Sequence, residues 1–131
     1  NFKATILKKG AQIISFESKS GKEILWHTDM SHYQKGKPLR GGIPICWPWF
    51  GKAQNPPHGF ARIVDWELQD REDTDEYVVL RWRLVDSEQT RAIWNHKFDL
   101  TLTMKPGDTI EMHLAIDTDV KTTGHFTLIS K

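Results

Sequence analysis

The chain has 131 residues, a length that suits one domain or part of a larger one. Its 18 Lys and Arg nearly balance its 17 Asp and Glu, and a net charge of +1 predicts no general affinity for nucleic acid or membrane surfaces. No apolar run approaches the ~20 residues that span a bilayer. The single Cys46 excludes an internal disulfide and is consistent with a reducing, cytoplasmic location.

The first 26 residues contain short apolar or alternating runs separated by turn residues. Two strands are predicted, at Phe2–Leu7 and Ala11–Phe16, with Lys8-Lys9-Gly10 as a tight connection between them. A turn at Ser18–Lys22 then leads to a short predicted strand at Glu23–Trp26. This opening therefore predicts antiparallel strands rather than helices.

The stretch Lys37–Arg62 follows a polar loop, His27–Lys37, and has the sequence KPLRGGIPICWPWFGKAQNPPHGFAR. Its many prolines and glycines are incompatible with a helix or a central strand, so we expect a long structured loop. No Asp or Glu occurs between Met30 and Val64, whereas the rest of the chain has 13 Lys and Arg against 17 Asp and Glu. The segment supplies five cations: Lys35, Lys37, Arg40, Lys52 and Arg62. A local basic segment on an otherwise acidic chain predicts an anionic ligand.

The second half of the chain is dominated by period-two alternation. Strands are predicted at Ile63–Gln69, Tyr77–Val85, Phe98–Met104 and Thr109–Ile116, with Val120–Lys131 as a weaker candidate. Turns are predicted at Asp70–Glu76 and Pro106–Asp108, and the only helical candidate is Ser87–Trp94, with Ser87 as its cap. Strands about seven residues long, separated by turns, predict an all-β antiparallel β-sandwich without an internal domain boundary.

The sequence predicts no metal site. Six histidines without a cysteine partner show no zinc-type spacing. The acidic segment Asp70–Glu76 lacks the glycine that a calcium-binding loop needs for its turn, so a solvated hairpin tip is the better interpretation.

The motif Arg40-Gly41-Gly42 allows two interpretations. It is either an ordinary turn with a solvated arginine, or a place where the backbone approaches a ligand and Arg40 binds a carboxylate or phosphate through two parallel hydrogen bonds. The aromatic run Trp47-Pro48-Trp49-Phe50 is likewise either core packing or the wall of a sugar pocket, and one tryptophan could serve each purpose.

The motif Pro57-His58-Gly59-Phe60-Ala61-Arg62 places an imidazole four residues before a guanidinium. His58 either braces the loop or hydrogen-bonds an anionic, polar ligand. The basic run and the presence of Arg40 favour the second interpretation about as strongly as the first.

Taken together, LRGGIPICWPWFG and PPHGFAR resemble the D-hexose-6-phosphate mutarotases (glucose-6-phosphate 1-epimerases) of the aldose 1-epimerase superfamily. KKGAQIISFESKSGKEILW resembles the opening hairpin of that family, and SEQTRAIWNHKFDLTLTM resembles a later segment. The resemblance covers essentially the whole chain.

The resemblance implies a galactose-mutarotase-like supersandwich, of which residues 1–131 would form the N-terminal part of a single domain. It implies that Arg40 and Arg62 bind the substrate, with one or both facing its phosphate. Pro57 would lie at the substrate site and offer its carbonyl, and His58 would line the site. The implied partner is a hexose 6-phosphate, without a metal or organic cofactor; the oligomeric state is not implied.

The implied reaction interconverts the α and β anomers by ring opening and closure. A base takes the proton of the C1 hydroxyl while an acid protonates the ring oxygen. The family's acid is a His on a strand into which VKTTGHFTLISK leads, although an ungapped alignment would place Thr127 there. The base is a Glu further on. We therefore expect both groups beyond Lys131, assign no catalytic residue in this chain, and expect the 131-residue piece alone to be inactive.

Two alternatives remain open. The chain could be a non-catalytic carbohydrate-binding β-sandwich, using Trp47 or Trp49 as a stacking platform and the arginines for acidic sugars, or an inactive fragment. A mutarotase for unphosphorylated sugars is disfavoured by the paired arginines.

Overall fold

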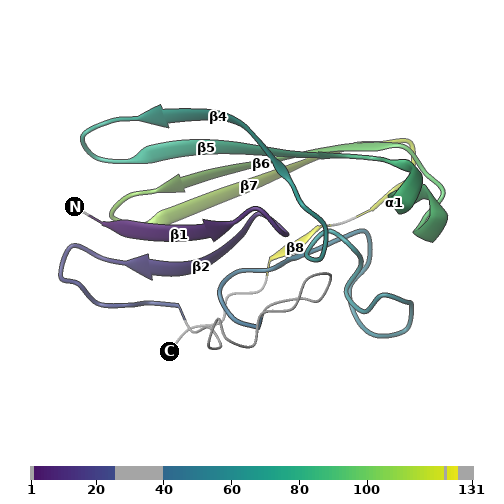
Figure 1. The fold of residues 1–131 in the computed structure, drawn as a ribbon, viewed down its shortest axis with the longest axis horizontal. Coiled ribbons are helices and arrows are strands. Elements are labelled where there is room, and N and C mark those ends of the chain that lie inside the picture. The colour runs from purple at the N-terminus through teal and green to yellow at the C-terminus, as the bar shows by residue number, and fades with distance from the viewer. Residues whose placement is uncertain (1, 26–39, 123, 127–131) are drawn as a thin grey trace.

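A computed structural model describes residues 2–25, 40–122 and 124–126 and is nearly all β (Figure 1). The elements in chain order are β1 Lys3–Leu7, β2 Gln12–Glu17, β3 Ile45–Cys46, β4 Glu67–Asp73, β5 Val78–Val85, α1 Glu88–Ile93, β6 Phe98–Pro106, β7 Ile110–Thr118 and β8 His125–Phe126. No described helix is long and apolar enough to cross a membrane.

One layer is an antiparallel sheet with strand order β4-β5-β6-β7. Alternation along β6 buries Phe98, Leu100, Leu102 and Met104 on one face, because successive side chains of a strand point to opposite sides. Leu102 pairs across the sheet with Trp82 on β5, which is also buried. The predicted strands Tyr77–Val85, Phe98–Met104 and Thr109–Ile116 are thus confirmed, with small shifts at their ends.

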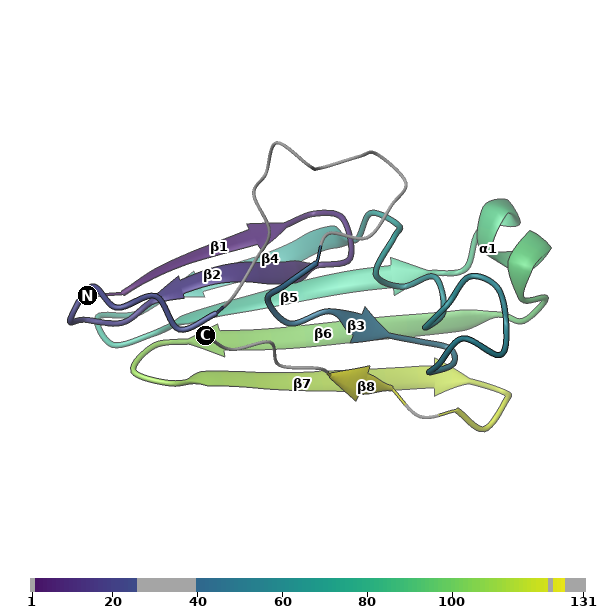
Figure 2. The ribbon, with the colours of Figure 1, turned by 90° about the horizontal axis from the view of Figure 1, so that it is seen from below.

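The other layer consists of the β1–β2 hairpin and the short β3–β8 pair, both antiparallel (Figures 1 and 2). Ile13 of β2 bridges to Ile43, which connects the hairpin to the segment leading into β3. Buried residues of both layers form the main core cluster, including Ile45 and Trp47 from one layer and Leu100 from the other. The predicted all-β antiparallel β-sandwich is confirmed.

The prediction of a strand at Ile63–Gln69 followed by an acidic turn at Asp70–Glu76 is wrong in its boundaries. The backbones of Val64 and Trp66 hydrogen-bond to the turn after β1 instead of to β5. Strand β4 then begins at Glu67 and includes most of the acidic segment. All seven residues of β4 are exposed at the sheet edge, and charged side chains are favoured there because they prevent further strand pairing.

The predicted strand Glu23–Trp26 is also wrong in its described part, since Glu23, which bridges to Glu17, and Leu25 form isolated bridges instead of a strand. The Glu23 carboxylate accepts hydrogen bonds from the Ser15 hydroxyl and from the backbone N–H groups of Phe16 and Leu25. The Glu23 side chain therefore satisfies backbone N–H groups that would pair with a neighbouring strand in a regular sheet. The described residues do not include Trp26 or the predicted polar loop from 27 to 37. They also exclude the end of the weaker candidate strand Val120–Lys131, of which only β8 is observed.

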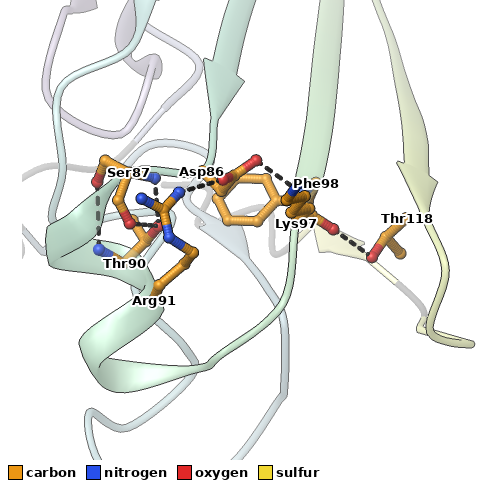
Figure 3. A network of polar contacts seen from close by, with 7 residues as sticks. All are labelled: Asp86, Ser87, Thr90, Arg91, Lys97, Phe98 and Thr118. Atoms are coloured by element: carbon orange, nitrogen blue, oxygen red, sulfur yellow. Dashed lines mark hydrogen bonds and ion pairs between the residues drawn. The ribbon is translucent and has the colours of Figure 1, made fainter.

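The predicted helix at Ser87–Trp94 is confirmed as α1, capped by Ser87 (Figure 3). The Ser87 hydroxyl accepts from the Thr90 backbone N–H at 3.2 Å, and the Thr90 hydroxyl accepts from the Ser87 backbone N–H at 2.8 Å. Asp86 accepts from the Phe98 backbone N–H and from Arg91. The helix is therefore joined to the start of β6 by side-chain hydrogen bonds.

Candidate functional site

The beginning of the loop formed by residues 40–62 is anchored on β2. The Gln12 side-chain N–H donates to the Gly41 carbonyl at 2.6 Å, and the Ile43 N–H donates to the Ile13 carbonyl at 3.0 Å. Gly42 has φ +65°, and a Cβ at this position would lie 2.1 Å from the Ile13 oxygen. The close contact of the loop backbone with β2 therefore requires glycine at position 42. The exposed Arg40 lies immediately before this contact.

The middle of the loop is anchored by Trp47, which is completely buried. Its ring packs edge-on against Phe60 and Phe98 at centroid distances of 5.8 and 4.7 Å. The Trp47 carbonyl accepts the N–H groups of both Phe60 and Ala61. Gly59 passes so close that a Cβ there would lie 2.0 Å from this oxygen. The aromatic run and the His-Gly-Phe motif are thus connected through the core.

The other two rings of the aromatic run have different environments. Trp49 is half-buried and donates its Nε1–H to the Pro56 carbonyl at 2.8 Å. Phe50 is 55% exposed. Because Trp47 is enclosed in the core, the interpretation of Trp47 as a sugar-stacking platform is wrong, and its role is core packing. A ligand-facing role for Trp49 stays a prediction.

His58 is fixed by two hydrogen bonds to Gly51. The His58 backbone N–H donates to the Gly51 carbonyl at 2.8 Å, and the Gly51 N–H donates to His58 Nδ1 at 3.1 Å. An Nδ1 that accepts a hydrogen bond carries no proton, so the neutral ring has its proton on Nε2 and offers that N–H as a donor. Burial and the positive charges of Arg62 and Lys52 lower the pKa of His58, which favours this neutral form.

His58 also has φ +62°, in the left-handed region that residues other than glycine rarely adopt. Strained backbone of this kind occurs preferentially at functional sites. The two hydrogen bonds to Gly51 maintain this conformation.

Arg62 is half-buried and donates from one guanidinium nitrogen to the Pro57 carbonyl at 3.0 Å. Its Nε–H is buried and has no partner among the described residues. Burial lowers the pKa of Arg62, although a guanidinium stays charged at neutral pH. Cys46 lies nearby and is buried, and burial raises the pKa of its thiol, which makes it a weak nucleophile.

The structure therefore brings three of the four predicted site residues together: Pro57, His58 and Arg62. Arg40 lies exposed at the other end of the loop, and no hydrogen bond or ion pair joins it to these three. The carboxylate-free composition of the loop leaves the Arg62 charge without an acidic partner in the described part of the chain, a property that suits an anion site.

Two cavities lie elsewhere in the molecule. One, of about 770 Å³, opens between β1 and the β4–β5 edge and is lined by residues such as Phe2, Leu68 and Trp82. The other, of about 750 Å³, lies near α1 and the segment from 63 to 67. Neither is lined by the predicted site residues, so the chemistry of the loop, and not cavity size, identifies the candidate site.

The contact between Phe50 of the aromatic run and His125 was not predicted from the sequence. Phe50 contacts His58 at a ring-centroid distance of 4.8 Å and His125 at 5.0 Å. His125 reaches the loop because Cys46 and His125 are partners in the β3–β8 pair. No local sequence pattern could predict the contact between Phe50 and His125, because the two residues are 75 positions apart. The only signal in the sequence was the aromatic run that contains Phe50.

The chain is similar in sequence and in fold to known proteins. The chain is 40% identical over 124 residues to a Salmonella typhimurium protein named "Putative glucose-6-phosphate 1-epimerase", covering 92% of this chain and 42% of the relative. The crystal structure of a "putative mutarotase (YeaD)" from the same species superposes with a TM-score of 0.88 at 40% identity, over 94% of this chain and 43% of that one.

A galactose mutarotase-like protein from Lactobacillus casei shares the fold, with a TM-score of 0.71 at 23% identity over 90% of this chain and 42% of that chain. This similarity confirms the galactose-mutarotase-like fold. The chain spans less than half the length of the relatives it matches.

The family model for aldose 1-epimerase matches residues 1–129, almost the entire chain. With this match, the relative of 40% identity and the shared sandwich, the chain belongs to the aldose 1-epimerase family.

Proposed function

We propose that the protein to which this chain belongs interconverts the α and β anomers of a hexose 6-phosphate, and that the loop 40–62 supplies its phosphosugar-binding part. The observation that carries the proposal is Arg62, a half-buried cation in a segment that lacks carboxylates, whose Nε–H has no partner among the described residues. The name of the Salmonella relative supports the same substrate class.

In this proposal the arginines hold the phosphate and His58 holds the sugar. A phosphate dianion satisfies guanidinium donors through short, charge-assisted hydrogen bonds. The neutral His58 donates from Nε2 to a sugar oxygen, a role that needs no change of protonation. The Pro57 carbonyl orients Arg62. Binding the remote phosphate orients the ring for proton transfer at C1 and the ring oxygen.

The groups that move protons are proposed to lie outside residues 1–131. Among the predicted site residues His58 is the only histidine, and its Nδ1 is occupied by the Gly51 N–H. It is therefore suited to binding and not to exchanging a proton. The assignment of residues 1–131 to the N-terminal part of one domain and a cytoplasmic location belong to the same proposal.

Removing either arginine tests the anchor. In the full-length protein, Arg62→Ala and Arg40→Ala each weaken glucose 6-phosphate binding roughly 10- to 100-fold, because a hydrogen bond to a charged group contributes about 1.5–3 kcal/mol. Isothermal titration calorimetry measures the affinity, and exchange NMR between the anomers measures the activity.

Arg83→Ala is the matched control, since it removes the same charge from an arginine paired with Asp99 on the solvent face of the sheet. Affinity that is unchanged in both loop variants would rule out the anchor. Phosphosugar binding without anomer exchange in the wild-type protein would favour the non-catalytic binding module instead.

A further inference from the structure

Phe50 combines high exposure with a fixed position. Its side chain is 55% exposed, the largest fraction among the described large apolar residues that face solvent. Single exposed apolar residues are common and need no explanation. Phe50 differs because its ring contacts two imidazoles, His58 at an interplanar angle of 60° and His125 at 39°.

The backbone next to Phe50 is also fixed. Gly51, its neighbour, makes both hydrogen bonds that hold His58, and Trp49 on the other side is bound through its indole to Pro56. The ring is thus presented to solvent by a constrained loop. A side chain whose conformational freedom is already restricted loses less entropy when a ligand orders it.

Phe50 lies at the proposed anion site. Its ring contacts His58, and the positive charge of Arg62 contributes to the lowered pKa of that imidazole. Arg62 also donates a hydrogen bond to the Pro57 carbonyl. A largely exposed aromatic ring, a neutral N–H donor and a cation therefore occur in one short segment. A phosphorylated sugar has the complementary set: an apolar face of C–H groups, hydroxyl oxygens and a dianion.

We propose that Phe50 is the stacking platform for the sugar ring and sets the preference for a cyclic phosphosugar over other phosphate monoesters. The inference rests on the proposed function. Aromatic rings in ligand sites provide apolar contact while a few polar groups fix orientation. The ring of Trp49 is a poorer candidate, because it is half-buried and its N–H is already donated.

The platform makes a prediction that the phosphate anchor alone does not make. Loss of the aromatic face weakens binding of glucose 6-phosphate and leaves binding of glycerol 3-phosphate unchanged, since that ligand has the phosphate but no ring. In the full-length protein, Phe50→Leu reduces glucose 6-phosphate affinity roughly 5- to 10-fold. Phe50→Tyr, which retains an aromatic face, stays within about twofold of wild type.

The experiment is calorimetric titration of both ligands into wild type, the two Phe50 variants and Leu68→Ala. Leu68 is the matched control, an exposed apolar residue on β4 and not part of the loop 40–62. Wild-type affinity of Phe50→Leu for glucose 6-phosphate overturns the platform, as does an equal loss for both ligands, which indicates a disturbed anchor.

Failure of the proposed function gives a different result. A wild-type protein that binds neither phosphate ester refutes the phosphosugar site and the platform together. A wild-type protein that binds glucose 6-phosphate and exchanges its anomers, with a Phe50→Leu variant that behaves identically, refutes the platform alone.

Discussion

In the β4–β7 sheet, neighbouring strands pair almost residue by residue, whereas the loop 40–62 contributes only the two-residue strand β3 to any sheet. The sheet is stabilised by repeated backbone hydrogen bonds and by one apolar face. The loop is stabilised by individual hydrogen bonds instead. The Gln12 amide donates to the Gly41 carbonyl, and the Phe60 N–H donates to the Trp47 carbonyl. Gly51 and His58 exchange two further hydrogen bonds. Its donors and cations are consequently available to a ligand, as is typical of functional loops on rigid scaffolds.

The largest effect is expected from Gly59→Ala in the loop. At φ +75° a Cβ meets the Trp47 oxygen at 2.0 Å. Positive-φ strain and overpacking each cost of order 1–3 kcal/mol, so we expect the free energy of unfolding to fall by about 4 kcal/mol. Urea denaturation measures the change.

Gly51→Ala is the matched control for this substitution. Its φ is +99°, but nothing lies within 4 Å of the added Cβ, so only the backbone strain remains, and a loss of about 1–2 kcal/mol is expected. Equal losses at the two glycines would show that the close approach to Trp47 does not stabilise the loop.

A smaller loss is expected in the sheet from Leu102→Ala. Leu102 is completely buried on β6, and truncation of a buried leucine costs about 3 kcal/mol through lost burial and the cavity left behind. Thr103→Ala, on the half-exposed face of the same strand, serves as the control. At temperatures where Leu102→Ala remains folded, glucose 6-phosphate affinity should stay at the wild-type value; a large loss would mean that sheet and loop are energetically coupled.

The smallest effect is expected for the pH dependence of stability that comes from the ion pair between Arg83 and Asp99 on the solvent face of the sheet. Two parallel hydrogen bonds from Arg83, at 3.0 and 2.7 Å, lower the pKa of Asp99 below its ordinary value of 3.8. Because the folded pKa is below the unfolded one, the stability from this pair is present above about pH 4 and is lost as the pH falls through the folded pKa.

Urea midpoints at pH 7 and pH 3 test this. Wild type should lose more stability between the two pH values than Asp99→Asn, by a small margin because surface ion pairs contribute little. Asp75→Asn, at the exposed turn after β4, should behave as wild type. Identical losses in wild type and Asp99→Asn would exclude a contribution from the pair.

Prediction from sequence succeeded where local pattern and tertiary environment agree. Alternation identified the strands that became β5, β6 and β7, and Ser87 identified the start of α1. It failed at β4, where Val64 and Trp66 alternate as in a strand but their backbones pair with the turn after β1. Local alternation cannot indicate which distant backbone will supply the hydrogen bonds.

The sequence by itself determined the all-β class, the basic and carboxylate-free character of the loop, and the resemblance that the comparisons confirmed at the level of the family. Tertiary structure alone decided which aromatic ring is buried and which is exposed. Trp47 and Phe50 belong to the same run, yet the first is enclosed by Phe60 and Phe98 and the second faces solvent beside His125. The physical reason is that burial depends on contacts between residues far apart in the chain, which form only when the two layers pack.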